Sequence, residues 1–140
     1  MKIFILEDDK ERIKDFFSMF DKHIVVASNN SDMAISILEK EKFDIIFLDH
    51  DLEGKQMVSS EGNTGFRVAS NLAKTKNFNT DVVLHSYNEK GVGNMKKILS
   101  SNSNFSGRIA VLPFGTFDTN IIYNMGNNDG SENKVTILSK

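Results

Sequence analysis

The 140-residue chain has the composition of an ordinary globular domain, with 39% hydrophobic residues, 26% charged residues and a formal net charge of −2. This small net charge gives no reason to expect general DNA binding or binding to a membrane surface. The absence of cysteine excludes disulfides, thiolate zinc sites and cysteine nucleophiles. The first apolar run stops at Glu7, too early for a secretory signal or a membrane span, so we expect a cytoplasmic protein.

Short apolar runs alternate with amphipathic segments along most of the chain. The runs predict strands at residues 3–6, 24–27, 44–48, 81–84 and 109–112. Apolar residues at helical spacing predict helices at 10–20, 33–38, 64–74 and 92–99. Asp9 is a suitable N-cap for the first helix, and Ser31 or Asp32 for the second. Strands that alternate with helices in this way predict an α/β fold, a flavodoxin-like, doubly wound five-stranded parallel sheet of order 2-1-3-4-5.

Two segments have no clear period. Residues 53–63 are rich in glycine, serine and charge, which predicts an exposed loop. We assign residues 1–118 to the α/β domain and residues 119–140 to a C-terminal extension of the same domain. The extension is either a short helix or a hairpin across the Asp129-Gly130 step, and we favour a short helix or loop followed by an added strand.

The stretch FDIIFLDHDL, residues 43–52, organises the rest of the chain. Its continuous apolar run is typical of a buried central strand, and it ends in Asp49 and Asp51. Ligands bind outside the carboxyl ends of the strands in open α/β sheets. Other polar residues follow the first strand (Glu7, Asp8 and Asp9) and the fourth (His85, Ser86 and Asn88).

The predicted strand order brings the carboxylates of the first and third strands together. Like charges at such short separations are unstable unless a cation lies between them or one of them is protonated. Oxygen ligands without cysteine suit Mg²⁺, Mn²⁺ or Ca²⁺, and Mg²⁺ is favoured when the substrate is a phosphate. We therefore expect a site for Mg²⁺ (or Mn²⁺) formed by Glu7, Asp8, Asp49 and Asp51.

The segments KIFILEDD, FDIIFLDHDL, VVLHSYN and VLPF resemble the receiver domains of bacterial response regulators. This resemblance implies that Glu7 and Asp8 hold Mg²⁺ and that Asp49 is the phospho-accepting aspartate. It also implies that Ser86 supplies the hydroxyl at the end of the fourth strand. The chain departs from the receiver pattern at Leu112, which stands where the family has a lysine before Pro-Phe.

The motif LDHDL, together with TGFRVA and HSYNEKG, resembles a receiver variant more closely, the cyclic-phosphate processing receiver domain. This implies action on a cyclic phosphate, either in a nucleotide or at an RNA end such as a 2′,3′-cyclic phosphate. The expected partner is therefore a small phosphate-containing ligand. The residues that ordinary receivers do not share are His50, Asp51, His85 and Asn88.

A weaker argument for an enzyme comes from the residues themselves. The missing lysine removes the cation that would balance a phospho-aspartate. Asp49 and Asp51 form a D-x-D arrangement similar to that of haloacid-dehalogenase-type phosphatases. In that scheme Asp49 attacks phosphorus or orients a metal-bound water, Asp51 transfers the proton, and Ser86 donates to a phosphoryl oxygen. Either His85 or His50 protonates the leaving alkoxide.

Other interpretations stay open. The chain could be a stand-alone receiver that signals by phosphorylation of Asp49, or a degenerate receiver that only binds a ligand or partner. Asp49 and Asp51 could also form a simple turn after the strand, and His85 could be a hydrogen-bonded residue beside the sheet. We expect Tyr87 and Phe114 to be packing residues rather than a platform for a base.

Overall fold

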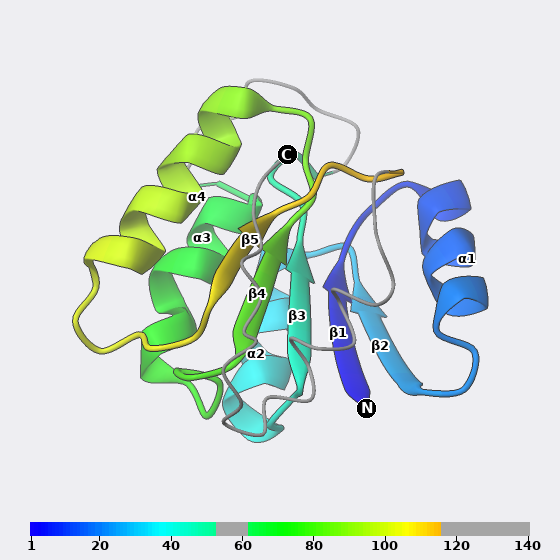
Figure 1. The fold of residues 1–140 in the computed structure, drawn as a ribbon, viewed down its shortest axis with the longest axis horizontal. Helices are drawn as coiled ribbons and strands as arrows, with labels where there is room; N and C mark the ends of the chain where they lie inside the picture. Colours follow the sequence, from blue (N-terminus) through cyan, green and yellow to red (C-terminus); the bar gives the residue numbers. More distant parts are fainter. Residues whose placement is uncertain (53–61, 116–140) are drawn as a thin grey trace.

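The computed structural model describes residues 1–52 and 62–115. All neighbouring strands pair in parallel, in the order β2-β1-β3-β4-β5 (Figure 1). The strands are β1 (Lys2–Leu6), β2 (Ile24–Ser28), β3 (Ile45–Leu48), β4 (Asp81–Leu84) and β5 (Ile109–Val111). The helices are α1 (Lys10–Met19), α2 (Ser31–Lys40), α3 (Gly65–Asn71), the 3₁₀ turn η1 (Leu72–Lys74) and α4 (Glu89–Ser101). The predicted fold class and strand order are confirmed.

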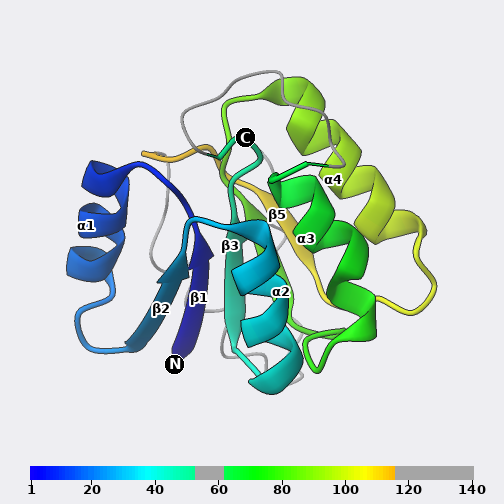
Figure 2. The same ribbon diagram turned by 180° about the vertical axis from the view of Figure 1, so that it is seen from behind.

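The described helices cover the two faces of the sheet unequally (Figures 1 and 2). Helices α2, α3 and α4 pack on one face, over alternate strand residues such as Leu6 and Leu48. Helix α1 packs on the other face, where Phe16 contacts Phe47. Both faces of β3 are therefore buried, which explains why its sequence is continuously apolar rather than alternating.

Several helix boundaries differ from the predicted ones, among them the starts of α2 and α4 and the end of α3. Asn30, rather than Ser31 or Asp32, caps α2, and its side chain accepts the N–H of Met33. Helix α4 begins at Glu89 instead of residue 92, because the Asn88 side chain caps it. The helical segment predicted at 64–74 ends as α3 at residue 71 and continues as η1. The free backbone N–H groups at the start of a helix are satisfied by local polar side chains. The periodicity of apolar residues therefore does not locate the ends of helices.

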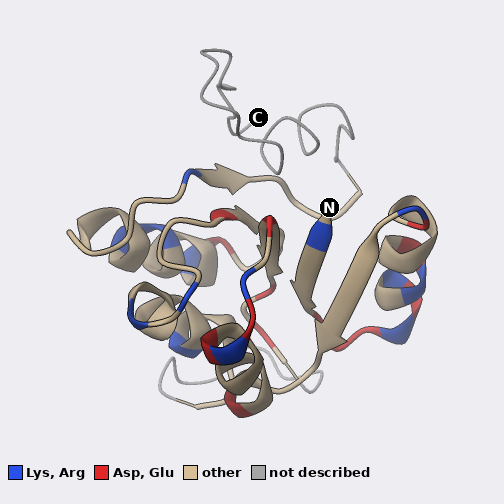
Figure 3. Ribbon diagram, turned by 90° about the horizontal axis from the view of Figure 1, so that it is seen from below, with Lys and Arg blue, Asp and Glu red and all other residues tan. Residues whose placement is uncertain are grey.

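Lys and Arg residues and Asp and Glu residues are spread over the described elements, and α1 carries both signs along its length (Figure 3). No helix within 1–52 and 62–115 is long and apolar enough to cross a membrane. The predictions for residues 53–61 and for the extension at 119–140 lie outside the described residues.

Candidate active site

The strand register brings three polar residues together at one edge of the sheet. Leu6 pairs with Leu48, and Leu48 pairs with Leu84. The next residues along these strands are Glu7, Asp49 and His85, at the carboxyl ends of β1, β3 and β4. The backbone pairing continues into this row, because Asp49 N–H donates to the carbonyl of Leu6 and His85 N–H to that of Leu48. The three side chains thus lie where parallel sheets bind ligands.

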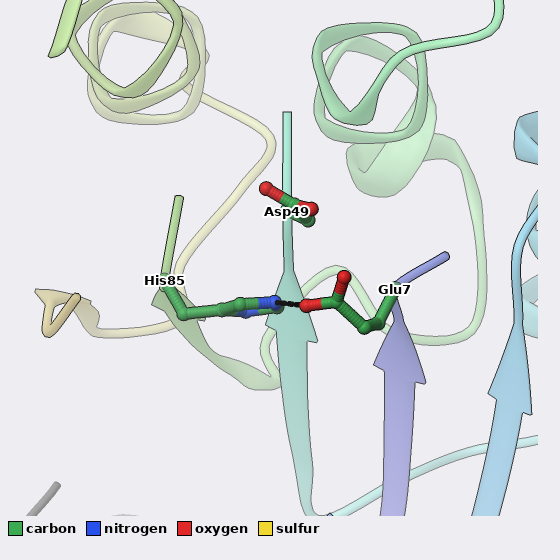
Figure 4. A group of neighbouring side chains, drawn as sticks. All are labelled: Glu7, Asp49 and His85. Carbon is green, nitrogen blue, oxygen red and sulfur yellow. Dashed lines mark hydrogen bonds and ion pairs between the residues drawn. The ribbon is translucent and has the colours of Figure 1, made fainter. Parts of the chain in front are cut away.

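Glu7, Asp49 and His85 form a compact buried cluster (Figure 4). One ligand atom from each lies within 4.8 Å of the others. His85 Nε2 lies 3.0 Å from Glu7 Oε1. The His85 ring is also in edge-on contact with Phe16, at 5.3 Å between ring centroids. An imidazole and two carboxylates therefore lie together in the protein interior, with aromatic rings on their α1 side.

Glu7 is held as a carboxylate despite its full burial. Burial by itself would raise its pKa, but the hydrogen bond and charge of His85, the Asp9 backbone N–H and the Arg12 guanidinium outweigh that effect and lower the pKa. Its Oε2 atom accepts the backbone N–H groups of Asp8 and Asp9. Since an ionised Glu7 can only accept, His85 donates to it through Nε2.

Asp49 is in the opposite electrostatic situation. Burial is the main cause that raises the pKa of Asp49 to about 6, and the charge of Glu7 adds to it. The charge of His85 and the hydrogen bonds from the His50 backbone and the Ser86 side chain act against this rise. The site thus contains one stably ionised carboxylate and one that resists ionisation, and a bound cation would relieve the second.

Asp51 belongs to a neighbouring polar cluster rather than to the group of three. Its Oδ1 lies 2.9 Å from His50 Nδ1, and both its oxygens accept from Asn88 Nδ2, at 3.1 and 3.2 Å. A Cβ at Gly91 would lie 2.4 Å from the His50 ring. Gly91 is thus required for close packing of α4 on His50.

The remaining predicted residues lie around these two clusters. Ser86 is buried, hydrogen-bonds Asp49 through its side chain and accepts the Asn88 N–H at 3.0 Å. Asp8 is partly exposed and is absent from the only group of three or more potential metal ligands found among the described residues. The structure therefore gathers Glu7 and Asp49 from the predicted metal set, adds His85, and places Asp51 with His50 and Asn88.

The chemistry of the donor set can be tested against the expected cation. Two carboxylate oxygens suit Mg²⁺ or Mn²⁺. The imidazole of His85 suits borderline metals better, and its Nε2 already donates to Glu7. The residues fit Mg²⁺ when Glu7 and Asp49 are the protein ligands and His85 orients Glu7 from behind, an arrangement common around metal sites.

Helix α3 begins directly against the site, and this contact permits only a glycine. A Cβ at Gly65 would lie 1.8 Å from the carbonyl oxygen of Asp49. We expect Gly65→Ala to lower the free energy of unfolding by roughly 1–3 kcal/mol or more, because the helix or the end of β3 must move. Urea unfolding measures the loss of stability, and Gly93→Ala in α4 is the matched control. The space at Gly93 is open within 4 Å, so we expect that alanine to stabilise by about 0.5–1 kcal/mol. Equal stability of the two variants would contradict the prediction.

Arg12 is a neighbour of the site that the sequence analysis missed. Its Nη1 lies 3.6 Å from Glu7 Oε1. The sequence contained a pattern that could have identified Arg12, because this residue precedes Phe16 and Phe20 by one and two helical turns and so shares their face of the helix. Both phenylalanines are buried against the sheet, so Arg12 stands at the site end of the same stripe.

Comparisons with known proteins agree with this architecture. The receiver domain of the sensor histidine kinase PA1611 from Pseudomonas aeruginosa PAO1, determined with a magnesium ion in its active-site cleft, is 14% identical, with a TM-score of 0.63 over 89% of this chain and 93% of that one. A two-component response regulator from Clostridium difficile is 19% identical, with a TM-score of 0.61 over 88% of this chain and 89% of its own. At such identities these likenesses show the fold alone.

The family itself is shown by sequence. No curated protein sequence matches the chain. The family model described as the cyclic-phosphate processing receiver domain matches residues 1–101, which include every residue of the two polar clusters. The resemblance seen in the sequence motifs is therefore confirmed, and the chain belongs to the family of cyclic-phosphate processing receiver domains.

Proposed function

We propose that this domain is a metal-dependent phosphoesterase that opens a cyclic phosphate, in a nucleotide or at an RNA end. The observation that supports it best is the buried cluster of Glu7, Asp49 and His85 at the carboxyl edge of the sheet. In this proposal Glu7 and Asp49 hold Mg²⁺ or Mn²⁺. The bound ion supplies Lewis-acid polarisation of the phosphoryl group.

The chain's own residues divide the remaining work. His85 donates to Glu7 Oε1 and so holds the orientation of the Glu7 carboxylate. Ser86, hydrogen-bonded to Asp49, is placed to orient a phosphoryl oxygen beside that carboxylate. When water attacks phosphorus and the bond from phosphorus to the leaving alkoxide oxygen breaks, Asp51 takes the proton of the water and passes it to that oxygen. Its side chain is 20% exposed, whereas the His50 side chain is only 4% exposed and that of His85 is fully buried. Asn88 and His50 hold the Asp51 carboxylate in place.

The test is hydrolysis of 2′,3′- and 3′,5′-cyclic nucleotides and of a short RNA with a 2′,3′-cyclic end. We expect the phosphomonoester product, detected by phosphorus NMR, with Mg²⁺ or Mn²⁺ and not with a chelator. Asp49→Asn should remove the activity, and the exposed Asp15→Asn should keep it. No turnover of any of these substrates with either metal would refute the proposal.

The alternative of a phosphorylated receiver also has an observation in its favour. Ser86 lies hydrogen-bonded to Asp49 at the end of β4, where the resemblance to receivers implies a hydroxyl. Incubation with beryllofluoride and Mg²⁺ separates the two functions. A stable adduct at Asp49 without turnover of cyclic phosphates would favour the receiver. Absence of Mg²⁺ binding in a titration would instead favour a degenerate domain that binds only a partner.

A further inference from the structure

The position of the missing receiver lysine is apolar and closed in this structure. Leu84 of β4 pairs with Val111 of β5, and Leu112 N–H then donates to the Leu84 carbonyl at 3.0 Å. Leu112 thus follows β5 in the same row in which His85 follows β4. Its side chain is 4% exposed and packs in the α1-side core. It contributes no positive charge to a site that contains two carboxylates.

Arg12 brings a positive charge to this edge of the sheet from α1. Its guanidinium carbon lies 5.6 Å from the centroid of the Tyr87 ring and 5.5 Å from that of the Phe114 ring. Tyr87 follows β4 and Phe114 follows β5, so the two rings hold the guanidinium beside the strand ends. The Tyr87 hydroxyl donates to the carbonyl of Phe114, which joins the two ring-bearing segments. The predicted packing role of these two aromatics thus takes a specific form, because they pack a cation.

The guanidinium retains unused hydrogen-bonding capacity. An arginine side chain has five N–H donors. Among the described residues, the polar contact of this guanidinium is the 3.6 Å approach to Glu7, which is longer than a hydrogen bond. The Arg12 side chain is 30% exposed, so the group is open to a ligand while its orientation is held by the two rings.

We propose that Arg12 is the phosphate-binding cation of the site, in place of the lysine that Leu112 replaces. The inference deepens the proposed function, since it assumes a phosphate ligand at Glu7 and Asp49. A guanidinium matches two phosphoryl oxygens at once, and such charge-assisted pairs are about twice as strong as neutral hydrogen bonds. Arg12 reaches the carboxylates from α1, on the side of the sheet that this helix covers, and would supply the positive charge that a phosphate bound beside Glu7 needs.

The experiment is a calorimetric titration of inorganic phosphate into the Mg²⁺-loaded protein, with Mg²⁺ alone titrated separately. Arg12→Gln should weaken phosphate binding about tenfold or more. It should leave Mg²⁺ binding unchanged or strengthen it, because a positive charge beside Glu7 has been removed. Arg12→Lys keeps the charge but loses the planar fork, so an intermediate affinity is expected. Lys14→Gln, the same charge change at an exposed position of α1, is the matched control and should bind phosphate like the wild type.

The different responses of phosphate binding and Mg²⁺ binding to Arg12→Gln separate a ligand-binding role from structural support. If Arg12 only supported Glu7, its loss would weaken Mg²⁺ binding as much as phosphate binding, and that result would overturn the proposal. Phosphate affinity within twofold of wild type in Arg12→Gln, an equal loss in Lys14→Gln, or no phosphate binding by the wild type would also overturn it. If Arg12→Gln does not fold, the Arg12→Lys comparison decides. Phosphate binding that depends on Arg12 without turnover of cyclic phosphates would refute the esterase and leave this assignment standing.

Discussion

Without a divalent cation, Asp49→Asn is expected to raise the free energy of unfolding at pH 7 by up to about 3 kcal/mol. The reason is that Asp49 is buried beside Glu7, and its pKa is raised to about 6 from an ordinary value of 3.8. Above pH 6 the folded protein must contain an ionised carboxylate that is better solvated in the unfolded chain. Asparagine has the same shape, accepts the same hydrogen bond from the His50 N–H and carries no charge.

The sign of the pH dependence follows from the direction of this shift. The unfolded chain releases the Asp49 proton near pH 4, whereas the folded protein keeps it until about pH 6. The folded wild type therefore loses stability from this group as the pH rises between these values. The advantage of Asp49→Asn should be absent below about pH 4, grow up to about pH 6 and stay constant above it.

Urea unfolding with a chelator between pH 4 and 8 measures the difference, with the exposed Asp15→Asn as the control for the change of charge. Added Mg²⁺ should reverse the order, because only the wild type gains binding energy in the folded state. An Asp49→Asn protein that is less stable than wild type at pH 7 without metal would show that the buried carboxylate is not under electrostatic strain.

Glu7→Ala is expected to have the opposite effect and to lower the free energy of unfolding by roughly 3–5 kcal/mol. The substitution leaves His85 Nε2 and the backbone N–H groups of Asp8 and Asp9 without their carboxylate acceptor. Unpaired buried donors cost far more than the net gain of a satisfied pair. The loss should appear as a fall of ~10 °C or more in the midpoint of thermal unfolding.

Glu7→Gln provides the matched control, since it keeps the shape of the side chain and one acceptor oxygen, and a smaller loss is expected. The pKa of Glu7 lies below its ordinary value of 4.5 in the folded protein. Its contribution is therefore complete above that value and is lost as the pH falls through the lower, folded value. The gap between wild type and Glu7→Ala should narrow in acid. A gap that is constant from pH 7 to pH 3 would argue that Glu7 acts only through its shape.

These two predictions describe a site in which neighbouring carboxylates have different physical roles. Glu7 is stabilised by the fold through His85 and two backbone N–H groups. Asp49, by contrast, lowers the free energy of unfolding of the metal-free protein at pH 7. Residues that reduce stability are expected where a protein needs a binding group that only its ligand can satisfy.

Much of the fold could be predicted because it depends on local patterns. Apolar runs that alternate with amphipathic segments determine an α/β sheet, and the hydrophobic continuity of residues 45–48 places that strand at its centre. The residues that cap the helices were harder to predict. Asn30 and Asn88 each act through a single side-chain hydrogen bond, which leaves no periodic pattern in the sequence.

The residue types of the site were also visible in the sequence, since polar groups that end buried strands point to one sheet edge. Their grouping was not visible. Asp49 and Asp51 are two residues apart, yet Asp49 lies with Glu7 and His85 while Asp51 lies with Asn88. Strand register decides which side chains follow the aligned leucines, and register is a property of pairing between distant segments.

The sequence by itself determined the layered α/β architecture, the family, and the acidic and imidazole groups available for chemistry. Only the tertiary structure decided that Glu7 and Asp49 differ in their ease of ionisation, because burial and the position of His85 set that difference. It also brought Arg12 of α1 beside the end of a strand where the lysine is missing. Electrostatic free energy depends on distance and burial through space, and neither can be obtained from separation along the chain.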